Sequence, residues 1–285
     1  MTLKVAIPDT SLTDCTDLRQ KTVKVGQIAR ALAIFRVEEM FVYNTGKLSP
    51  TQKRDADFLV KILRFMDTPQ YLRRRVFPHS PSLQYAGLLP PLRTYSHPLQ
   101  SAISDLKVES LRWGIQVRPG KIDLGFDNVI DFPDTLSERD PTLFRVEATS
   151  PKLSLSVIDR LEAPVYWGFD ALRTGDLLDL LNRSSKMTRI GFSRKAPPFR
   201  KLEIDLRTTV SNTGSVLAVF GGPTRGILEL CESQREDVKR QMDFWVNTIA
   251  DQGSETVRLE EALIVSLGLL NNLFGDVIAK PGFYE

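Results

Sequence analysis

Short apolar runs alternate with segments of helical periodicity near both ends of this chain, and that alternation limits the folds available to it. Residues 3–7 and 40–43 resemble strands, and the apolar residues at 25–35 and 58–65 recur at the three- and four-residue spacing of a helix face. Alternating strands and helices are typical of a parallel sheet with helical crossovers. We therefore predict an α/β domain that includes residues 1–87.

The middle of the chain, residues 88–166, has a different character. It opens with two prolines and continues as short β-like pieces, clearest at 108–117 and 143–157, separated by glycine and proline turn signals. A small β-barrel or sandwich inserted into the α/β domain is the natural interpretation. The α/β domain is then expected to be assembled from 1–87 and 167–285.

The last part of the chain returns to the strand–helix pattern. A helix is expected at 177–181, and strands at 189–192, 215–220 and 244–249. Residues 256–274 read as a helix that is apolar nearly all round. Such a helix must be buried in the domain core or against another subunit.

Composition argues against several classes of protein. The 285 residues are 42% hydrophobic and 26% charged, and the net charge of +3 is compatible with a nucleic-acid partner without requiring one. The two cysteines, Cys15 and Cys231, make neither a disulfide framework nor a zinc site, and no cluster has metal-ligand spacing, so we expect no metal. No cleavable leader and no apolar run of about 18 residues is visible, so we expect a cytoplasmic protein without a membrane span.

Three well-known nucleotide and hydrolase signatures are missing. No Gly-x-Gly-x-x-Gly follows the first strand, and neither a P-loop nor a Gly-x-Ser-x-Gly elbow occurs. These absences argue against a dinucleotide-binding site, a P-loop nucleotidase and a serine hydrolase.

A glycine-rich turn, residues 220–226, follows one of the apolar strands. Glycines let a backbone pass close to a ligand, and the start of a following helix offers free N–H groups. Ligands of open α/β sheets bind outside the carboxyl ends of the strands, where this turn falls. A plain tight turn is the alternative interpretation.

A polar loop, residues 247–256, separates the next strand from the apolar helix. Its hydrogen-bonding side chains suit a binding loop, but helix capping would also explain them. In that alternative Ser254 or Thr256 is the N-cap, and Glu260 and Glu261 lie in the first turns.

Two basic clusters are candidates for RNA contact. Residues 183–201 carry seven basic side chains and no acidic one, with Phe192 and Phe199 among them. Basic side chains with interleaved aromatics suit phosphate contacts and base stacking, although a solvated surface explains them equally well. The candidate RNA-binding residues are Arg73, Arg74, Arg75, Lys186, Arg189, Arg194, Lys195, Arg200 and Lys201.

Three of these segments, in this order, resemble the motifs of SpoU-type methyltransferases of the SPOUT (SpoU–TrmD) superfamily. Residues 24–35 are similar to the first motif, an Asn-Val-Gly-x-Ile-x-Arg helix. The turn at 220–226 resembles the second, and 247–262 resembles the third. Departures occur at Lys24 and Arg258, where the motifs have Asn, and at Arg36, where Gly is usual, so the target base does not follow from the motifs.

Two further segments narrow the resemblance. Residues 7–12 and 85–90 are similar to an archaeal–eukaryotic group of RNA methyltransferases that carries an inserted OB-like barrel, which would match 88–166. The resemblance therefore implies a knotted (trefoil) α/β methyltransferase domain with an inserted OB-like β-barrel. It also implies S-adenosylmethionine as cofactor, RNA as partner and a homodimer that uses the knot helices.

The resemblance also implies which residues form the site. Arg30 is the first catalytic candidate, with Arg258 and Glu261 after it; because arginine has a pKa above ~12, we expect Arg30 to orient the target or stabilise negative charge rather than act as a base. A solvent-facing role for Arg30 and capping roles for the other two compete. The expected cofactor-binding residues are Ser193, Phe220, Gly221, Gly222, Pro223, Gly226, Asn247, Thr248, Ile249, Gln252, Gly253, Ser254, Thr256, Val257 and Ala262.

Our prediction is an S-adenosylmethionine-dependent methyltransferase that modifies a nucleotide in a structured RNA, rRNA or tRNA. The main alternative is an RNA-binding protein of the same fold without turnover. A methyltransferase for protein or small molecules is a third candidate, against which the basic run at 183–201 argues.

Overall fold

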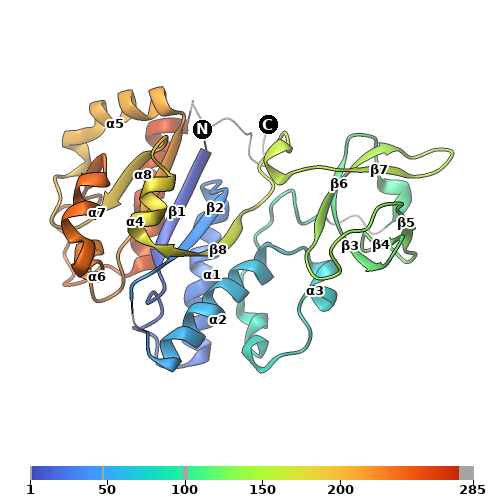
Figure 1. The fold of residues 1–285 in the computed structure, drawn as a ribbon, viewed down its shortest axis with the longest axis horizontal. Helices are drawn as coiled ribbons and strands as arrows, with labels where there is room; N and C mark the ends of the chain where they lie inside the picture. The colour runs from blue at the N-terminus through green and yellow to red at the C-terminus, as the bar shows by residue number, and fades with distance from the viewer. Residues whose placement is uncertain (1, 47, 99–101, 276–285) are drawn as a thin grey trace. The chain divides into compact units, whose positions relative to one another are not determined.

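A computed structural model describes residues 2–46, 48–98 and 102–275, and these residues form two compact units (Figure 1). The first unit comprises the chain up to Arg64, Tyr85–Pro90 and the described residues from Phe169 onward. The second comprises Phe65–Gln84 and Pro91–Gly168. Residues 65–84, which we expected in the α/β domain, therefore group with the inserted unit.

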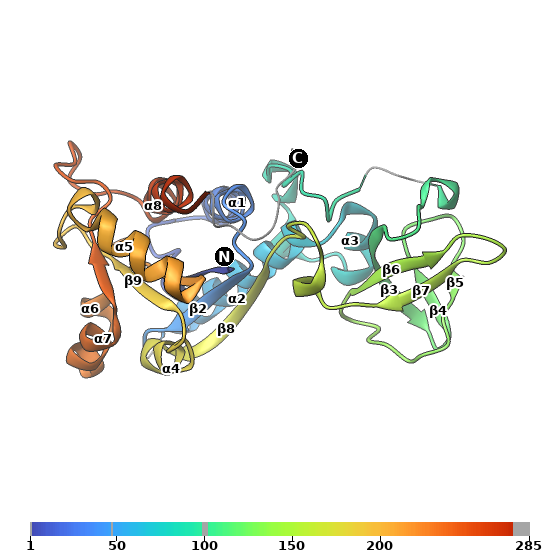
Figure 2. The ribbon, with the colours of Figure 1, turned by 90° about the horizontal axis from the view of Figure 1, so that it is seen from above.

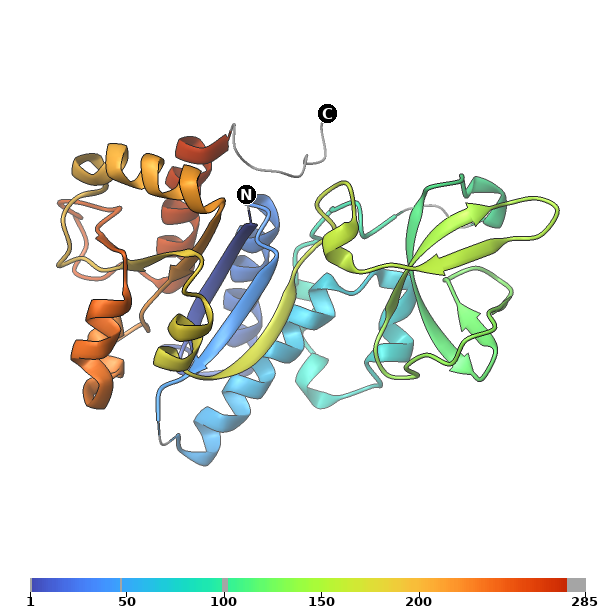
Figure 3. The same cartoon turned by 45° about the horizontal axis from the view of Figure 1, so that its top comes forward.

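The first unit is built on a six-stranded sheet in the order β11-β9-β10-β1-β2-β8, and every neighbouring pair is parallel. Figure 3 shows β1, β2 and β8 side by side. The expected strands are confirmed in position; β8, an edge strand with alternating exposed residues, was missing from the prediction. The bounds are β1 Thr2–Pro8, β2 Glu39–Asn44, β8 Asp170–Asp176, β9 Thr188–Phe192, β10 Ser215–Val219 and β11 Phe244–Val246.

Helices cover both faces of this sheet, which is why its central strands are mostly apolar. Figure 2 shows α1 (Leu18–Ile34), α5 (Phe199–Thr213) and α8 (Leu259–Phe274) on one side. The other side carries α4 (Leu177–Arg183), α6 (Ile227–Leu230) and α7 (Arg235–Gln241). A further helix, α2, spans Pro50–Asp67, and a short 3₁₀ helix, η5, spans Glu232–Gln234.

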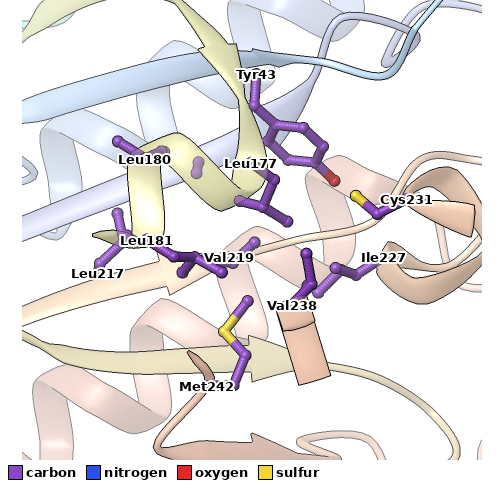
Figure 4. Close-up of a cluster of buried hydrophobic side chains, with 11 residues drawn as sticks. Tyr43, Leu177, Leu180, Leu181, Leu217, Val219, Ile227, Cys231, Val238 and Met242 are labelled. Atoms are coloured by element: carbon purple, nitrogen blue, oxygen red, sulfur yellow. The ribbon is translucent and has the colours of Figure 1, made fainter. Parts of the chain in front are cut away.

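The face with α4, α6 and α7 is sealed by a continuous apolar cluster. Figure 4 shows Leu177, Leu180 and Leu181 of α4 gathered over Leu217 and Val219 of β10. These side chains are nearly or fully inaccessible to solvent. A close-packed layer of this kind fixes the carboxyl ends of the strands in space and makes them a firm base for loops.

Two helix boundaries differ from the prediction. Helix α8 begins at Leu259 rather than 256, and its N-cap is Arg258, whose N–H donates to Glu261 Oε2 at 2.9 Å. Neither Ser254 nor Thr256 is the N-cap, so that part of the capping interpretation is wrong. Helix α5 was not predicted; it begins after Pro198 within the basic run and ends at Thr213, and its C-cap Gly214 has the left-handed φ of 63°.

The second unit contains a five-stranded antiparallel sheet, β5-β4-β3-β6-β7, that curls on itself (Figure 3). One apolar cluster includes Leu72, Trp113 and Leu143, and another includes Ile122 and Phe144. The strands are β3 Leu111–Arg118, β4 Lys121–Asp123, β5 Ile130–Asp131, β6 Thr142–Ala148 and β7 Ser154–Val157, and α3 spans Gln70–Val76. Short 3₁₀ helices occur at Pro81–Leu83, Ala86–Leu88, Ile103–Asp105 and Arg160–Glu162; Ala86–Leu88 belongs to the first unit.

Candidate functional site

A cavity of about 510 Å³ opens within the first unit, at the carboxyl ends of β9, β10 and β11. These three strands are neighbours in the sheet, so the loops that follow them meet at one edge. The walls come from the loop after β9, the glycine turn after β10, the polar loop after β11 and the first turns of α8. The volume is in the range of small-molecule sites.

Most residues that we expected to bind the cofactor line this one cavity, although they lie up to 69 positions apart in the sequence. Gly253 and Ser254 do not line it and are exposed. The lining members of the set are Ser193, Phe220, Gly221, Gly222, Pro223, Gly226, Asn247, Thr248, Ile249, Gln252, Thr256, Val257 and Ala262.

The glycine turn is tight because its backbone folds back on itself. Gly222 N–H donates to the Arg225 carbonyl at 2.9 Å. A Cβ added at Gly221 would lie 3.0 Å from both Gly226 Cα and Ile227 N, so a side chain here would force the turn open. Tyr43 on β2 supports the turn, since its hydroxyl donates to the Phe220 carbonyl at 2.8 Å, and burial raises the pKa of this phenol well above its ordinary value.

The polar loop after β11 is held by its own side chains. Asn247 is the centre of this arrangement: Nδ2 donates to the Arg194 carbonyl at 3.1 Å, and Oδ1 accepts from Ile249 N at 3.0 Å. The hydroxyls of Thr248 and Ser266 lie 2.7 Å apart, which joins the loop to α8. The wall therefore keeps its shape through two half-buried hydrogen bonds and one exposed one.

Aromatic rings form an apolar part of the cavity wall. Phe192 and Phe220 stack with centroids 4.6 Å apart and an interplanar angle of 19°, and both are buried. Trp245 of β11 also lines the cavity and is half-buried. A Cβ on Gly191 would lie 2.8 Å from the Trp245 ring, so this glycine lets the indole lie flat against β9.

The charged side chains of the wall are mainly basic: Arg194, Lys195, Arg225 and Arg235, with Glu229 as the one carboxylate. Lys195 Nζ pairs with Glu229 Oε1 at 3.1 Å, and Arg225 pairs with Glu232 at 2.5 Å. The Gly226 N–H and, after it, Lys195 lower the pKa of Glu229, so this carboxylate stays ionised at neutral pH. Among the described residues, the Arg194 side chain donates only to the Glu255 carbonyl, at 3.3 Å.

The three catalytic candidates do not line the cavity. Arg30 is half-buried on α1, and Arg258 and Glu261 are exposed at the start of α8. Glu261 caps the helix by accepting from Arg258 N–H. Within a single chain, then, the cavity holds the cofactor candidates without the catalytic ones.

The first basic cluster, on α3 of the second unit, has three different environments. Arg73 donates to the carbonyls of Thr68 (2.9 Å) and Met66 (3.1 Å) and lies over the Phe65 ring, and burial lowers its pKa to about 10. Arg75 is bonded to Asp123. Arg74 is exposed. The Arg73 guanidinium is therefore occupied within the fold, and we exclude it from the proposed RNA surface.

The second cluster is similarly divided. Arg189 is a structural residue: its guanidinium pairs with Asp243 at 2.9 Å and donates to Gln241 at 2.7 Å, which ties β9 to the segment before β11. Arg194 and Lys195 line the cavity. The remaining members, Lys186, Arg200 and Lys201, are exposed, the last two in the first turn of α5.

Sequence reasoning missed several residues of the site. Tyr43 and Trp245 were assigned only to strands, Arg225 only to the glycine-rich turn, and Arg235 to no role. Trp245 was detectable, because an aromatic residue in a strand directly before a polar loop is well placed to form a cavity wall. Arg235 lies far from any motif and carries no such signal.

The described residues can be searched for metal-binding clusters, membrane-spanning helices and disulfides. Over those residues no three or more His, Cys, Asp or Glu side chains are grouped so as to hold a metal ion. No helix within the described ranges is long and apolar enough to cross a membrane. Cys15 and Cys231 are both free thiols.

Comparison with known proteins places this geometry in context. The family described as "Putative RNA methyltransferase" matches residues 2–270. An uncharacterized protein of Halobacterium salinarum is 32% identical, over 95% of this chain and 99% of that protein. The human 28S rRNA (uridine-N(3))-methyltransferase is 28% identical, over 94% of this chain and 77% of that protein.

Similarity to solved structures is weaker. The crystal structure of a methylase family protein from Neisseria gonorrhoeae covers 94% of this chain and 80% of its own, at 12% identity and a TM-score of 0.37. That similarity is too low to carry an argument about the fold.

Proposed function

The chain belongs to the family described as "Putative RNA methyltransferase", and from this premise we propose that it transfers a methyl group from S-adenosylmethionine to a nucleotide of a structured RNA. The observation that carries the proposal is the cavity, where loops from three neighbouring strands bring the cofactor candidates together. The cytoplasm is the proposed place of action. An RNA-binding protein of the same fold without turnover is the alternative.

The cavity residues fit an adenosyl methyl donor. The stacked pair Phe192–Phe220 offers apolar surface, and the tight turn at Gly221 and Gly222 presents backbone to the cavity. The side chains of Thr248 and Gln252 add polar groups. When bound, S-adenosylmethionine supplies an activated methyl group on a sulfonium, so the reaction needs alignment rather than a metal.

The chain's own residues would then orient and enclose the methyl donor. Asn247 fixes the loop that borders the cavity, and Tyr43 fixes the glycine turn from below. The apolar wall excludes water from the space around the methyl group, because water there would hydrate the nucleophile. The arginines of the wall, Arg194, Arg225 and Arg235, favour a nucleophile that has lost its proton, because they stabilise negative charge on the target.

Uridine N3 in large-subunit rRNA is the first target to test. The curated human, mouse and fly relatives carry the name 28S rRNA (uridine-N(3))-methyltransferase. N3 bears a proton in the neutral base, so the methylated species requires its removal. We extend this target to the present chain as a proposal.

A homodimer is proposed because α1 and α8 leave apolar side chains uncovered on the face they share. Ile264 and Val265 of α8 are 45% and 38% exposed, and Ile34 of α1 is 52% exposed. Arg30 lies one helix turn from Ile34. Since Arg30 does not line the cavity of its own chain, a second copy packed on this face would have to bring it there.

The finer fold assignments are also proposals. SPOUT membership with a trefoil knot is supported by the order β11-β9-β10, in which the chain passes beyond β9 to form β11 and then returns as α8 against α1. The OB-like assignment of the second unit is supported by its five antiparallel strands and their curl.

The test of activity is methyl transfer from radiolabelled S-adenosylmethionine to large-subunit rRNA that lacks the modification. The expected result is incorporation at one uridine, mapped by mass spectrometry as N3-methyluridine. Binding of donor and RNA without incorporation would select the alternative without turnover.

The shared-site arrangement has its own test, in which Arg30→Ala and Gly221→Trp, each inactive alone, are unfolded and refolded together. About a quarter of wild-type activity should return, because half of randomly paired dimers are mixed and each mixed dimer keeps one intact site. No recovery would mean that Arg30 does not act across subunits. Ile264→Asp should convert the dimer to monomer in analytical ultracentrifugation.

A further inference from the structure

We propose that the α7 side of the cavity is the seat of the target nucleotide, with Arg235 pairing a phosphate and Trp245 contacting a base. This inference rests on the proposed function and deepens it, because it assigns to one side of the cavity a substrate role that the motif-like segments do not cover. Arg235 is the first residue of α7, and Trp245 lies in β11.

The balance of charge separates this seat from the donor. Four cations and one carboxylate line the cavity. S-adenosylmethionine has a sulfonium, an ammonium and a carboxylate, so it is itself a net cation and does not account for the excess positive charge of the wall. The excess positive charge of the wall instead suits an anion, and RNA phosphate is the anion that the family's substrate supplies.

Ion pairing within the wall shows where the excess lies. Lys195 is compensated by Glu229, and Arg225 by Glu232. Within the described ranges, the Arg194 side chain finds only a neutral carbonyl as its acceptor. For Arg235, the described part of the chain provides neither an ion pair nor a side-chain hydrogen bond, and the side chain is exposed. Arg235 is thus the wall cation best able to take an external phosphate.

An aromatic surface accompanies this free guanidinium. Trp245 Nε1 donates to the Lys239 carbonyl of α7 at 3.3 Å, so the indole is fixed to the helix that begins with Arg235. Its ring packs against Gly191 and also borders the cavity. A fixed aromatic ring and a free arginine on the wall of one cavity match the way proteins hold single-stranded nucleotides, by stacking and by phosphate contact.

The direct test is binding of a fluorescein-labelled ten-nucleotide oligouridine to the full-length protein, in the presence of saturating S-adenosylhomocysteine. Arg235→Gln should raise Kd about tenfold and flatten the dependence of log K on log salt by roughly one unit. Arg240→Gln is the matched control: it removes the same charge from the same helix, at an exposed residue outside this cavity, and should leave Kd unchanged. Equal losses in both variants, or none in Arg235→Gln, would overturn the proposal.

A second pair of variants tests the ring. Trp245→Leu should weaken oligouridine binding at least fivefold, whereas Trp245→Phe should retain most of it. Titration with S-adenosylmethionine by calorimetry accompanies each variant, and Kd for the donor should stay within about twofold of wild type. A large loss of donor affinity in Arg235→Gln would place the guanidinium in the donor pocket and contradict the assignment.

The two levels of the proposal fail in different ways. If Arg235→Gln selectively weakens RNA binding but the wild type transfers no methyl group, the nucleotide seat stands and the enzyme assignment falls. If the wild type methylates RNA and Arg235→Gln does so with unchanged KM, the enzyme assignment stands and the nucleotide seat falls.

Discussion

Both units of this protein combine arginine with aromatic side chains, but in different surroundings. In the second unit, Arg112 is 2% exposed, and its Cζ lies 4.5 Å from the centroid of the Tyr71 ring and 4.1 Å from that of the Phe126 ring. Its Nε donates to the Leu124 carbonyl at 2.6 Å. In the first unit, Arg235 shares a cavity wall with Trp245 and is exposed. The same pair of residue types holds a fold together in one place and faces open space in the other.

What distinguishes the two regions is whether backbone carbonyls are available to the cation. A buried carbonyl needs a donor, and a buried arginine needs acceptors, so the two stabilise each other in the second unit. At the edge of the parallel sheet Arg225 donates to the Glu229 carbonyl at 2.5 Å and Arg194 to the Glu255 carbonyl at 3.3 Å, whereas the described residues offer the Arg235 side chain no such acceptor. The predictions below test this difference.

The largest effect should come from Arg112→Ala. The substitution removes a buried side chain between two rings and leaves the Leu124 carbonyl without this donor, so the free energy of unfolding should fall by about 3 kcal/mol. Urea denaturation measures it. The affinity of the folded protein for S-adenosylmethionine should be unchanged, since the cavity lies wholly within the first unit. A loss below about 1 kcal/mol in the free energy of unfolding would mean that Arg112, between its two rings, does not hold the second unit together.

The next prediction compares neighbours on α3. Arg73→Met removes donors from the Met66 and Thr68 carbonyls and should cost about 1–2 kcal/mol of stability, with RNA affinity unchanged. Arg74→Met, at an exposed position on the same helix, should leave stability within about 0.5 kcal/mol of wild type. Thermal unfolding and oligouridine binding of both variants separate the roles, and equal stability losses would contradict them.

A buried hydrogen bond beneath the cavity should matter in a different way. Tyr43→Phe removes the donor to the Phe220 carbonyl, so the glycine turn loosens, and stability should fall by about 1 kcal/mol. Donor affinity should fall with it, about threefold to tenfold, because the turn forms the wall. Calorimetric titration checks this. A stability loss without any change in donor affinity would show that the turn does not contact the donor.

The smallest effect concerns pH in the second unit. Burial is the main cause that lowers the pKa of His97 below its ordinary value of 6.5, and Nε2 donates to the Met66 carbonyl at 2.9 Å, so the folded state favours the neutral ring. Its contribution to stability is therefore present above pH 6.5 and lost as pH falls from there toward the folded pKa. His97→Gln should remove that part of the pH dependence, and His79→Gln, at an exposed position, should not.

These examples show which features were predictable from sequence and which were not. The glycine turn and the polar loop were found because their residue types are unusual directly after an apolar strand. Helix α5 was missed because its start lies in a run of basic residues and prolines. Arg73 and Arg194 looked alike because a basic cluster does not reveal which carbonyls lie near it in space. Residues 65–84 group with the second unit, and helical periodicity alone does not say which core a helix joins.

The catalytic candidates illustrate a further limit. The motif position of Arg30 suggested a role in the reaction, but the chain folds so that Arg30 and the cavity are separate. A single sequence carries no information about a second copy of itself, except through uncovered apolar residues such as Ile264. The exposure of Ile264 depends on how α8 packs against α1, which the sequence alone does not show.

The central claim is that the cavity at the ends of β9, β10 and β11 binds the methyl donor. The most direct measurement is calorimetric titration of the protein with S-adenosylmethionine, beside Gly221→Trp and the control Gly87→Ala, whose added Cβ meets nothing within 4 Å. The account predicts micromolar-range binding to the wild type and to Gly87→Ala, and at least a hundredfold loss in Gly221→Trp with a wild-type circular dichroism spectrum. Wild-type binding that is absent at millimolar donor, or that survives Gly221→Trp, would contradict it.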